Sequence, residues 1–381
     1  METKAIWLNG KLVPKADATL NFLTPALHYG VAVFEGIRCY ATARGPCVFR
    51  LRDHIDRLFD SARVLGFREL PYTVDQIALA CLETVRANGF EECYIRPLVW
   101  LAEGGWNLTV DGGKPYFGIA VWEWKQYLGA EAADRGVRAN ISSFTRHHPN
   151  VMMTKAKIAG NYPNSVLAKT ESLRLGFDEA ILLDPQGMVA ECTGENIFLV
   201  RKGTLYTPPD GTILEGLTRD AILTLAGDMG YTVVAKPISR DQLYVADEVF
   251  VCGTAAEVIG LREIDFRTIG SGKTGPVTRE FQAAYRALVR GTHPRSEEWL
   301  APVYPRNSPF AERAEEVADV LDETVGLFQG GEVPPQRRLG ETLEAVSALD
   351  PRAGREGALV GEPDGAARHA QAFAAGEPER S

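Results

Sequence analysis

The chain has 381 residues, of which 45% are hydrophobic, 24% charged and 9% aromatic. This balance is typical of globular proteins and excludes a wholly disordered chain, a collagen-like repeat and a coiled-coil rod. Lys and Arg number 41 against 50 Asp and Glu, a net charge of −9, which argues against nucleic acid and anionic membrane surfaces as partners. The first residues lack the pattern of a signal peptide, no apolar run is long enough to span a bilayer, and the six Cys form no CxxC pair. We therefore expect a cytoplasmic protein with two or three domains.

Two amphipathic helices are predicted in the first part of the chain. The first has a stripe of apolar residues at helical spacing and ends at Gly66, a residue type that favours helix termination. The members of this stripe are Ile55, Leu58, Phe59, Ala62 and Leu65. The second helix is expected to begin at Thr73, which forms a capping box with Gln76, and to end at Asn88-Gly89.

Two strands and a linker follow these helices. Residues 94–101 and 117–124 are rich in β-branched and aromatic residues and predict strands. Residues 128–136 contain no β-branched residue and separate these strands from the next set. We therefore expect a small N-terminal α/β domain at residues 1–127 and an interdomain linker at 128–136.

From residue 137 to residue 304 the pattern of strands and helices begins again, which predicts a larger C-terminal α/β domain. Tight turns at 185–187 and 202–203 separate short apolar runs that predict strands. A helix after Gly216, a short helix capped by Ser239 and Gln242, a strand at 248–253 and a last helix at about 277–290 are also expected. Because several neighbouring strands are expected to be antiparallel, the predicted fold class is mixed α/β (α+β), without a doubly wound parallel sheet.

The composition changes near residue 305. Residues 305–381 contain 15 acidic and 8 basic residues, a net charge of −7, and no Ile, Tyr, Trp, Met, Cys or Lys. Such a segment buries too little apolar surface to offset the entropy of ordering it, so this acidic, Gly- and Pro-rich tail is predicted to be largely disordered. Within it, residues 310–328 have the apolar spacing of an amphipathic helix, which could dock on the main body or on a partner.

Short catalytic motifs do not by themselves identify a function. GSGKTG at residues 270–275 resembles part of a nucleotide phosphate loop, but that loop requires a glycine where this chain has Arg267, so a surface turn is predicted. The adjacent His147 and His148 cannot both face one ion from a helix or strand, and no HExxH or zinc spacing is present, so no metal site is predicted. The GxSxG motif of acyl-transfer enzymes is also missing from the sequence.

Residues 1–304 resemble the branched-chain amino-acid aminotransferases, which belong to the class IV, or fold type IV, pyridoxal-phosphate enzymes. The matching segments are LHYGVAVFEGIRCY (27–40), HIDRLFDSA (54–62), YIRPL (94–98), KAKIAGNY (155–162), AECTGENIFLV (190–200), LEGLTRDAI (214–222) and CGTAAEV (252–258). The resemblance implies a two-domain D-amino-acid aminotransferase-like fold with pyridoxal 5'-phosphate as cofactor. It further implies reversible transfer of the amino group of L-Leu, L-Ile or L-Val to 2-oxoglutarate by a ping-pong mechanism, in branched-chain amino-acid biosynthesis. A homodimer or higher homo-oligomer is implied as well, in which a neighbour's loop completes the pocket.

The same resemblance assigns the residues that hold the cofactor. It selects Lys157, and not the nearby Lys155, as the residue that binds the cofactor aldehyde and moves the α-proton. Burial and a cationic cofactor are expected to lower the pKa of this amine. The remaining cofactor contacts implied are Tyr162 to the ring oxygen, Glu191 to the ring nitrogen, and Arg57, Leu217, Thr218 and Thr254 to the phosphate.

For the substrate, the resemblance implies an apolar wall and two carboxylate sites. The wall is assigned to Tyr29, Phe34, Trp124 and Tyr127, the α-carboxylate to Tyr94 and the backbone of Thr254 and Ala255, and the distal carboxylate of glutamate to Arg96. Because a methylene group in a hydrophobic pocket changes binding by only about 1–3 kcal/mol, discrimination among Leu, Ile and Val is expected to be modest.

Some positions depart from the family pattern and leave the substrate range open. They are Pro163, Cys192-Thr193, Ile259-Gly260 and the loop at 103–113 with Trp106. A D-amino-acid aminotransferase or an aminodeoxychorismate lyase of the same class therefore remains an alternative. The alternatives outside the class are a nucleotide-binding protein that uses GSGKTG and an inactive scaffold whose tail recruits partners.

Overall fold

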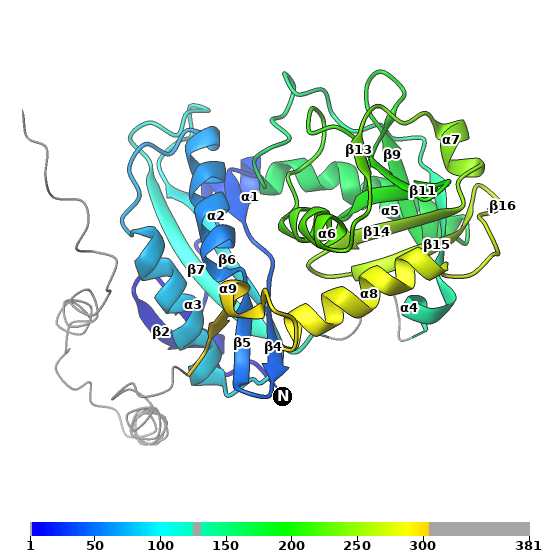
Figure 1. Cartoon of the computed structure of the whole chain (residues 1–381). Coiled ribbons are helices and arrows are strands. Elements are labelled where there is room, and N and C mark those ends of the chain that lie inside the picture. Colours follow the sequence, from blue (N-terminus) through cyan, green and yellow to red (C-terminus); the bar gives the residue numbers. More distant parts are fainter. Residues whose placement is uncertain (1, 125–130, 305–381) are drawn as a thin grey trace, which may run out of the picture. The chain divides into compact units, whose positions relative to one another are not determined.

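The N-terminal strands form an antiparallel sheet in the computed structural model, which describes residues 2–124 and 131–304 (Figure 1). The strand order is β17-β5-β4-β6-β7-β1-β2, and β3 pairs with β6. The bounds are β1 Ala5–Leu8, β2 Lys11–Pro14, β3 Ala32–Phe34, β4 Ile37–Thr42, β5 Gly45–Phe49, β6 Cys93–Glu103, β7 Lys114–Trp122 and β17 Leu300–Pro302.

Two helices, α2 (Leu51–Leu65) and α3 (Val74–Asn88), pack together and against this sheet (Figure 1). The predicted stripe of α2 lies mostly in the core because its spacing places the apolar side chains on one face. Gly66 ends this helix with a φ of 103°, and the capping box of α3 is present. The other elements here are the 3₁₀-helix Lys15–Asp17 and α1 Pro25–Tyr29.

The second sheet has the order β10-β9-β8-β15-β14-β11-β12-β13, with β16 paired to β15. The pairs β8–β9, β8–β15 and β12–β13 are parallel and the other pairs are antiparallel. The strands are β8 Val137–Ile141, β9 Glu179–Leu183, β10 Val189–Cys192, β11 Asn196–Arg201, β12 Thr204–Thr207, β13 Val233–Ala235, β14 Glu248–Gly253, β15 Glu257–Ile264 and β16 Arg267–Thr268. The helices are α4 Ala132–Arg135, the 3₁₀-helix Ala159–Asn161, α5 Tyr162–Arg174, α6 Leu217–Asp228, α7 Arg240–Tyr244, α8 Pro276–Val289 and α9 Ser296–Trp299.

This architecture confirms the predicted mixed α/β fold class, and most of the predicted elements are present. The expected linker contains α4 (Ala132–Arg135), a short helix that its sequence did not indicate. Near the end of the predicted second domain, 137–304, β17 pairs with β5 of the first sheet, and the extent of that domain stays a prediction. A strand of three residues is too short to show a periodic pattern, so its partner could not be predicted.

The two sheets share part of their hydrophobic core. One buried cluster combines Tyr40, Cys47 and Phe49 of the first sheet with Phe198, Phe250 and Phe281 of the second part of the chain. All the described residues accordingly fall within one compact unit. The division into two domains at 128–136 stays a prediction, because residues 125–130 lie outside the described residues, as do the tail 305–381 and its predicted helix.

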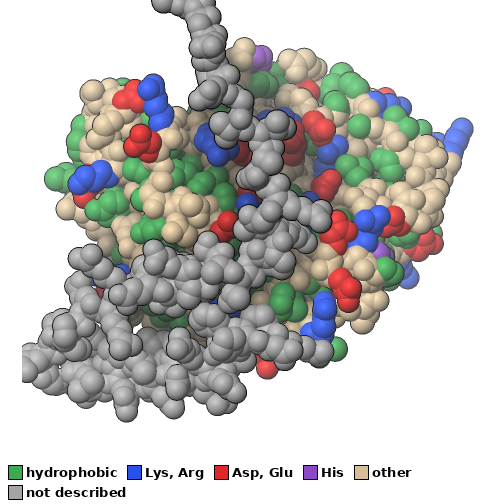
Figure 2. Space-filling model, turned by 60° about the vertical axis from the view of Figure 1, so that its left-hand side comes forward, with side chains coloured by type: hydrophobic (Ala, Val, Ile, Leu, Met, Phe, Trp, Pro, Cys, Tyr) green, Lys and Arg blue, Asp and Glu red, His purple; other side chains and the backbone are tan. Residues whose placement is uncertain are grey.

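Acidic and basic side chains are interspersed on the uncovered part of the face shown in Figure 2. This mixture agrees with the modest net charge of −9 for the whole chain. Within residues 2–124 and 131–304, no helix combines the length and the apolar character that crossing a membrane requires.

Candidate active site

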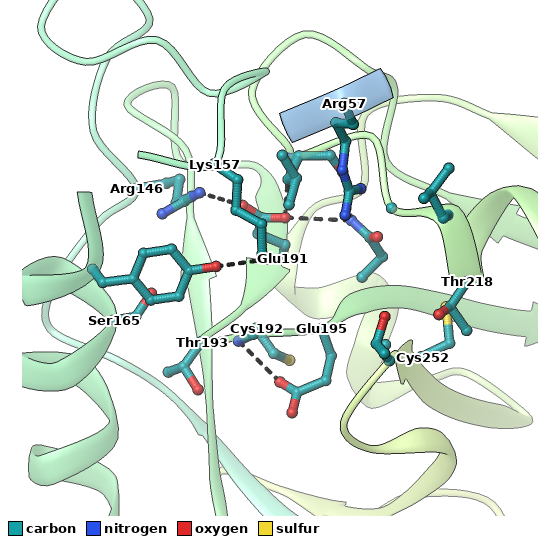
Figure 3. Close-up of a pocket in the computed structure, with 18 residues that line it drawn as sticks. Arg57, Arg146, Lys157, Ser165, Glu191, Cys192, Thr193, Glu195, Thr218 and Cys252 are labelled. Atoms are coloured by element: carbon teal, nitrogen blue, oxygen red, sulfur yellow. Dashed lines mark hydrogen bonds and ion pairs between the residues drawn. The ribbon is translucent and has the colours of Figure 1, made fainter. Parts of the chain in front are cut away.

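Lys157 lies where the two parts of the chain meet, and its backbone is fixed from both directions. Its N–H donates to the Ser61 hydroxyl at 3.0 Å, and its carbonyl accepts from the N–H of Phe34 at 3.1 Å. The Lys157 amine lies 2.9 Å from the hydroxyl of Tyr162, the first residue of α5. Figure 3 shows the Lys157 side chain directed into a pocket. Lys155, by contrast, pairs with Glu215 at 2.9 Å and does not line this pocket.

Among the groups of the chain itself the pKa of the Lys157 amine is raised, and the lowering expected from a cationic cofactor stays a prediction. Burial does lower this pKa, but the charges of Tyr162 and Glu35 outweigh burial. Sequence reasoning missed Glu35, which follows β3 and whose side chain is fully buried. The expectation had counted the positive charge of a cofactor and no carboxylate of the chain.

Two buried carboxylates line the same pocket, and their surroundings differ. Glu191 of β10 lies 2.7 Å from Arg146 and accepts hydrogen bonds from the Asn196 amide at 3.3 Å and the Leu214 N–H at 3.2 Å. Glu195 accepts from the N–H of the residue before it, and burial followed by the charge of Glu179 raises its pKa to about 8. Glu191 thus has the Arg146 guanidinium beside it, whereas burial and the charge of Glu179 disfavour ionisation of Glu195. Neither Arg146 nor Asn196 was predicted, because no spacing in the sequence marks them.

Helix α6 opens into the pocket at its N-terminus. Its N-cap, Gly216, makes no side-chain capping bond, and Leu217 and Thr218 line the pocket. A Cβ on Gly216 would lie 2.0 Å from the Asn196 side-chain oxygen, so a glycine is required here. The unpaired N–H groups of a helix N-terminus attract anions. Thr254, in the turn between β14 and β15, lines the pocket as well.

Arg57 reaches this pocket from α2 and is held by a carboxylate on the way. Its Nε and Nη2 lie 2.6 and 2.9 Å from the two oxygens of Glu35, and its Nη1 donates to the Glu215 carbonyl at 2.6 Å. His54, one turn earlier on α2, lies 2.8 Å from Glu35. Burial raises the pKa of Glu35, but Arg57 and His54 outweigh it and hold the pKa well below its usual range. All seven residues predicted to hold the cofactor therefore line one pocket, and Figure 3 labels four of them.

Most of the residues predicted for the substrate form a chain of contacts that begins at Lys157. The Phe34 ring packs edge-to-face on Tyr162, and the Arg96 guanidinium lies 4.6 Å from the Phe34 ring centre and 5.3 Å from that of Tyr94. Tyr94 in turn stacks on Trp124 with ring centres 4.5 Å apart. The Trp124 indole N–H donates to the Ala255 carbonyl at 3.4 Å, which brings in the last member of the chain.

Two predicted substrate residues are not part of this chain of contacts. Among the described residues, the ring of Tyr29 contacts His28 and Trp106, and Tyr29 itself is 45% exposed. The structure therefore places Tyr29 at the surface and not among the residues that line the pocket. Tyr127 lies outside the described residues.

The GSGKTG segment ends at the N-terminus of α8, where a carboxylate already occupies the anion position. Glu248 accepts from the backbone N–H groups of Val277 at 3.0 Å and Thr278 at 2.8 Å, and from the Thr278 hydroxyl at 2.6 Å. A phosphate at this helix would meet a buried negative charge. The prediction of a turn in place of a phosphate loop is confirmed.

Comparison with known proteins places the chain in a class that fits this pocket. The model of the family "Amino-transferase class IV" matches residues 32–264, and the chain belongs to this family. The branched-chain-amino-acid aminotransferase of Pseudomonas aeruginosa is 49% identical over 294 residues, which cover 77% of this chain and 95% of that protein.

Solved structures agree with this assignment. The crystal structure of the Escherichia coli branched-chain amino acid aminotransferase is similar with a TM-score of 0.78 and 42% identity, over 80% of this chain and 100% of that one. The branched-chain amino acid aminotransferase of Thermobaculum terrenum, solved in its PLP-form, gives a TM-score of 0.74 and 36% identity, over 80% of this chain and 99% of that one. The family and the fold that the sequence resembles are confirmed, and the chain is an enzyme of this class.

Proposed function

We propose that the chain is a pyridoxal-phosphate-dependent branched-chain amino-acid aminotransferase that transfers the amino group of L-Leu, L-Ile or L-Val to 2-oxoglutarate by a ping-pong mechanism. The observation that carries this proposal is the pocket itself. It gathers the Lys157–Tyr162 pair, the buried Glu191 and the open N-terminus of α6 within reach of one small molecule. The names of the similar proteins point to the same activity.

The residues of the pocket fit pyridoxal phosphate. When bound, this cofactor supplies an aldehyde that takes up the amino group and a ring that delocalises the electrons of the substrate α-carbon. Lys157 would hold the aldehyde end, and its Nζ, 2.9 Å from the Tyr162 hydroxyl, is the atom that moves a proton. Glu191 can accept one more hydrogen bond and so keep a ring nitrogen protonated, because a carboxylate accepts about four. Arg57 and the N–H groups of Leu217 and Thr218 would bind the phosphate.

Arg96 supports the pairing of a branched-chain amino acid with 2-oxoglutarate. Its guanidinium lies among the rings of Phe34, Tyr94 and Trp122, so an aliphatic side chain can pack beside those rings. Its Nε is buried without a hydrogen-bond partner, and no ion pair to Arg96 is present among the described residues. An unsatisfied buried donor of this kind is suited to the distal carboxylate of glutamate or 2-oxoglutarate.

A homodimer or higher homo-oligomer is part of the proposal. Phe22, Leu27, Tyr29, Trp106 and Leu108 are exposed, and ring contacts through His28 join three of them into one apolar patch. Exposed patches of this kind mark interfaces, and a second copy covering this one would bring a further chain close to Tyr29. Sedimentation equilibrium should show a dimer or larger species. Trp106→Asp should shift it toward monomer and lower activity, whereas Val245→Asp, an exposed residue outside the patch, should not.

The function is tested by reconstitution with pyridoxal phosphate, borohydride reduction and peptide mapping. The label is expected on Lys157, and Lys157→Ala should abolish turnover of L-Leu with 2-oxoglutarate. Lys155→Ala is the matched control, since Lys155 lies two residues away and outside the pocket. Turnover of D-Ala or aminodeoxychorismate without turnover of L-Leu would contradict the substrate assignment and leave the class intact.

A further inference from the structure

The turn between β14 and β15 contains a residue in an unusual conformation. Gly253 pairs with Glu257 across this hairpin, so the turn consists of residues 254–256. Glu257 has a φ of 60°, which is the left-handed region. Glu257 is the first strand residue after this turn, and glycine is favoured at such a position because a Cβ disfavours the left-handed conformation. A glutamate here keeps a carboxylate at a position where glycine would fit with less strain.

The side chain of Glu257 connects the turn to the first sheet. Its carboxylate lies 2.7 Å from Nη1 of Arg38, a residue of β4 that precedes it by 219 positions. Arg38 is only 11% exposed, and its guanidinium lies 4.6 Å from the ring centre of Tyr40 on the same strand. Arg38 is therefore held in place on the sheet, and Glu257 is held by Arg38.

A second contact connects the same turn to the same sheet. The Ala255 carbonyl accepts from the indole N–H of Trp124, and Trp124 stacks on Tyr94 of β6. The turn contains Thr254 and Ala255. These are the two residues assigned above to the phosphate and to the α-carboxylate. The groups proposed for the opposite end of the substrate, on Phe34 and Arg96, belong to the first sheet. The position of the turn relative to that sheet thus sets the width of the substrate site.

We propose that Glu257, held by Arg38, is a positioning residue that fixes the 254–256 turn against the first sheet and so sets how tightly a substrate carboxylate binds. This inference rests on the proposed function. It adds a role for Arg38 and Glu257, which touch neither cofactor nor substrate in that proposal. Without this ion pair the turn would keep the Trp124 contact but lose the one that Glu257 makes with the first sheet. The affinity of the enzyme for substrate acids should then fall by a larger factor than kcat, the turnover rate of the enzyme–substrate complex.

Glu257→Gly separates this role from a structural one. Glycine favours the left-handed conformation and so offsets part of the stability lost with the ion pair, and the variant should stay folded at the assay temperature. The probe is 4-methylvaleric acid, which has the carbon skeleton of leucine without the amino group. Its dissociation constant from the pyridoxal-phosphate form should rise about tenfold, the KM for L-Leu should rise in parallel, and kcat should change less than threefold.

Lys202→Gly is the matched control. Lys202 also has a left-handed φ, 51°, but it lies in the turn between β11 and β12 and does not line the pocket. This variant should gain the same conformational relief and bind 4-methylvaleric acid like the parent. Arg38→Gln should reproduce the tenfold rise, and the Arg38→Gln/Glu257→Gly double variant should be no weaker than either single variant, because both remove one interaction.

An unchanged dissociation constant in Glu257→Gly, with normal turnover by the parent enzyme, would overturn this inference alone. So would a tenfold rise accompanied by an equal loss of pyridoxal phosphate on dialysis, since the turn would then act through the cofactor. Failure of the parent enzyme to transaminate L-Leu would refute the proposed function, and this inference with it.

Discussion

Helices α6 and α8 begin in nearly the same way, yet only α6 opens into the candidate active site. Each has a glycine at its N-cap, Gly216 or Gly275, and neither glycine provides a side-chain cap. Each glycine also abuts the first residue of a strand: a Cβ would lie 2.0 Å from Asn196 of β11 in one case and 2.1 Å from Glu248 of β14 in the other. The difference is the charge of that neighbour.

At α8 the neighbour is a carboxylate that accepts the helix N–H groups itself. At α6 the neighbour is a neutral amide that donates to Glu191 and to the Leu214 carbonyl, and so leaves the helix N–H groups to a ligand. The glycine-rich sequence before α8 is therefore not what makes an anion site. The residue type on the neighbouring strand decides whether a helix N-terminus is filled from within the protein or from outside.

The largest effect is expected from alanine at the two glycines. Their φ angles, −70° and −80°, are open to any residue, so the only penalty is the collision of the new Cβ. Gly216→Ala should displace Asn196 and weaken pyridoxal-phosphate binding about 100-fold, or ~2.7 kcal/mol. Gly275→Ala should lower the melting temperature with the cofactor affinity unchanged. Fluorescence titration of the apoenzymes and thermal denaturation measure the two effects, and equal cofactor loss in both variants would contradict the comparison.

Removing the Glu248 carboxylate at the N-terminus of α8 should lower the stability of the protein. It should not change the function, because α8 does not open into the candidate active site. Glu248→Ala leaves two backbone N–H groups and the buried Thr278 hydroxyl without their acceptor, and the expected loss is about 2 kcal/mol in urea unfolding. In this background, Gly275→Ala should cost little more, because its collision partner is gone. If the losses of unfolding free energy from Glu248→Ala and Gly275→Ala were additive in the double variant, a collision with Glu248 would not be the reason for a glycine at position 275.

A smaller effect is expected from one threonine in the first turn of each helix. Thr218 and Thr278 are both buried in the first turn of their helix. Valine keeps the backbone N–H of Thr218 and removes only the hydroxyl, which can donate to the phosphate as well, so Thr218→Val should raise the dissociation constant for pyridoxal phosphate about tenfold, or ~1.4 kcal/mol. Thr278→Val should lose about 1 kcal/mol of unfolding free energy, since its hydroxyl bonds to Glu248, and should bind the cofactor normally. Weaker cofactor binding in Thr278→Val but not in Thr218→Val would mean that the phosphate binds at α8 and not at α6.

Local sequence signals predicted the helices well because their determinants are close together in the chain. The capping boxes at Thr73–Gln76 and Ser239–Gln242 and the glycine after α2 act over three or four residues, and all three are present. The pairing of β17 with β5 and the contact between Arg38 and Glu257 join residues more than 200 positions apart. No local pattern encodes such a pair.

The candidate site shows the same limit. Residue type and spacing could not separate Lys157 from Lys155; only the family resemblance did, and the structure gives the physical difference, a pocket on one side and Glu215 on the other. Glu35 was invisible for the opposite reason. A glutamate after a short apolar strand is usually exposed, and its burial depends on Arg57 and His54 of α2, which the sequence does not mark as its partners.

The smallest predicted effect concerns Glu195, an acid on the α6 side of the comparison. It lines the pocket beside Gly253, and burial and the charge of Glu179, opposed by Lys169, raise its pKa to about 8. Protonation of Glu195 at lower pH removes one negative charge from the pocket into which α6 opens, and its ionisation as the pH rises adds one. The raised pKa also means that its contribution to stability is fully present below the unfolded pKa and is lost as pH rises through 8.

Glu195→Gln, which cannot ionise, should remove both dependences. Between pH 7 and pH 9 the parent enzyme should lose about 1 kcal/mol of unfolding free energy more than the variant, and its affinity for pyridoxal phosphate should fall while that of the variant changes less. All other titrating groups are common to the two proteins, so the difference between their pH profiles reports Glu195 alone. Parallel profiles would mean that Glu195 is already ionised at pH 7. An anion could then bind at α6 with a carboxylate close by. In that case the neutrality of the neighbouring residues would not be what distinguishes α6 from α8.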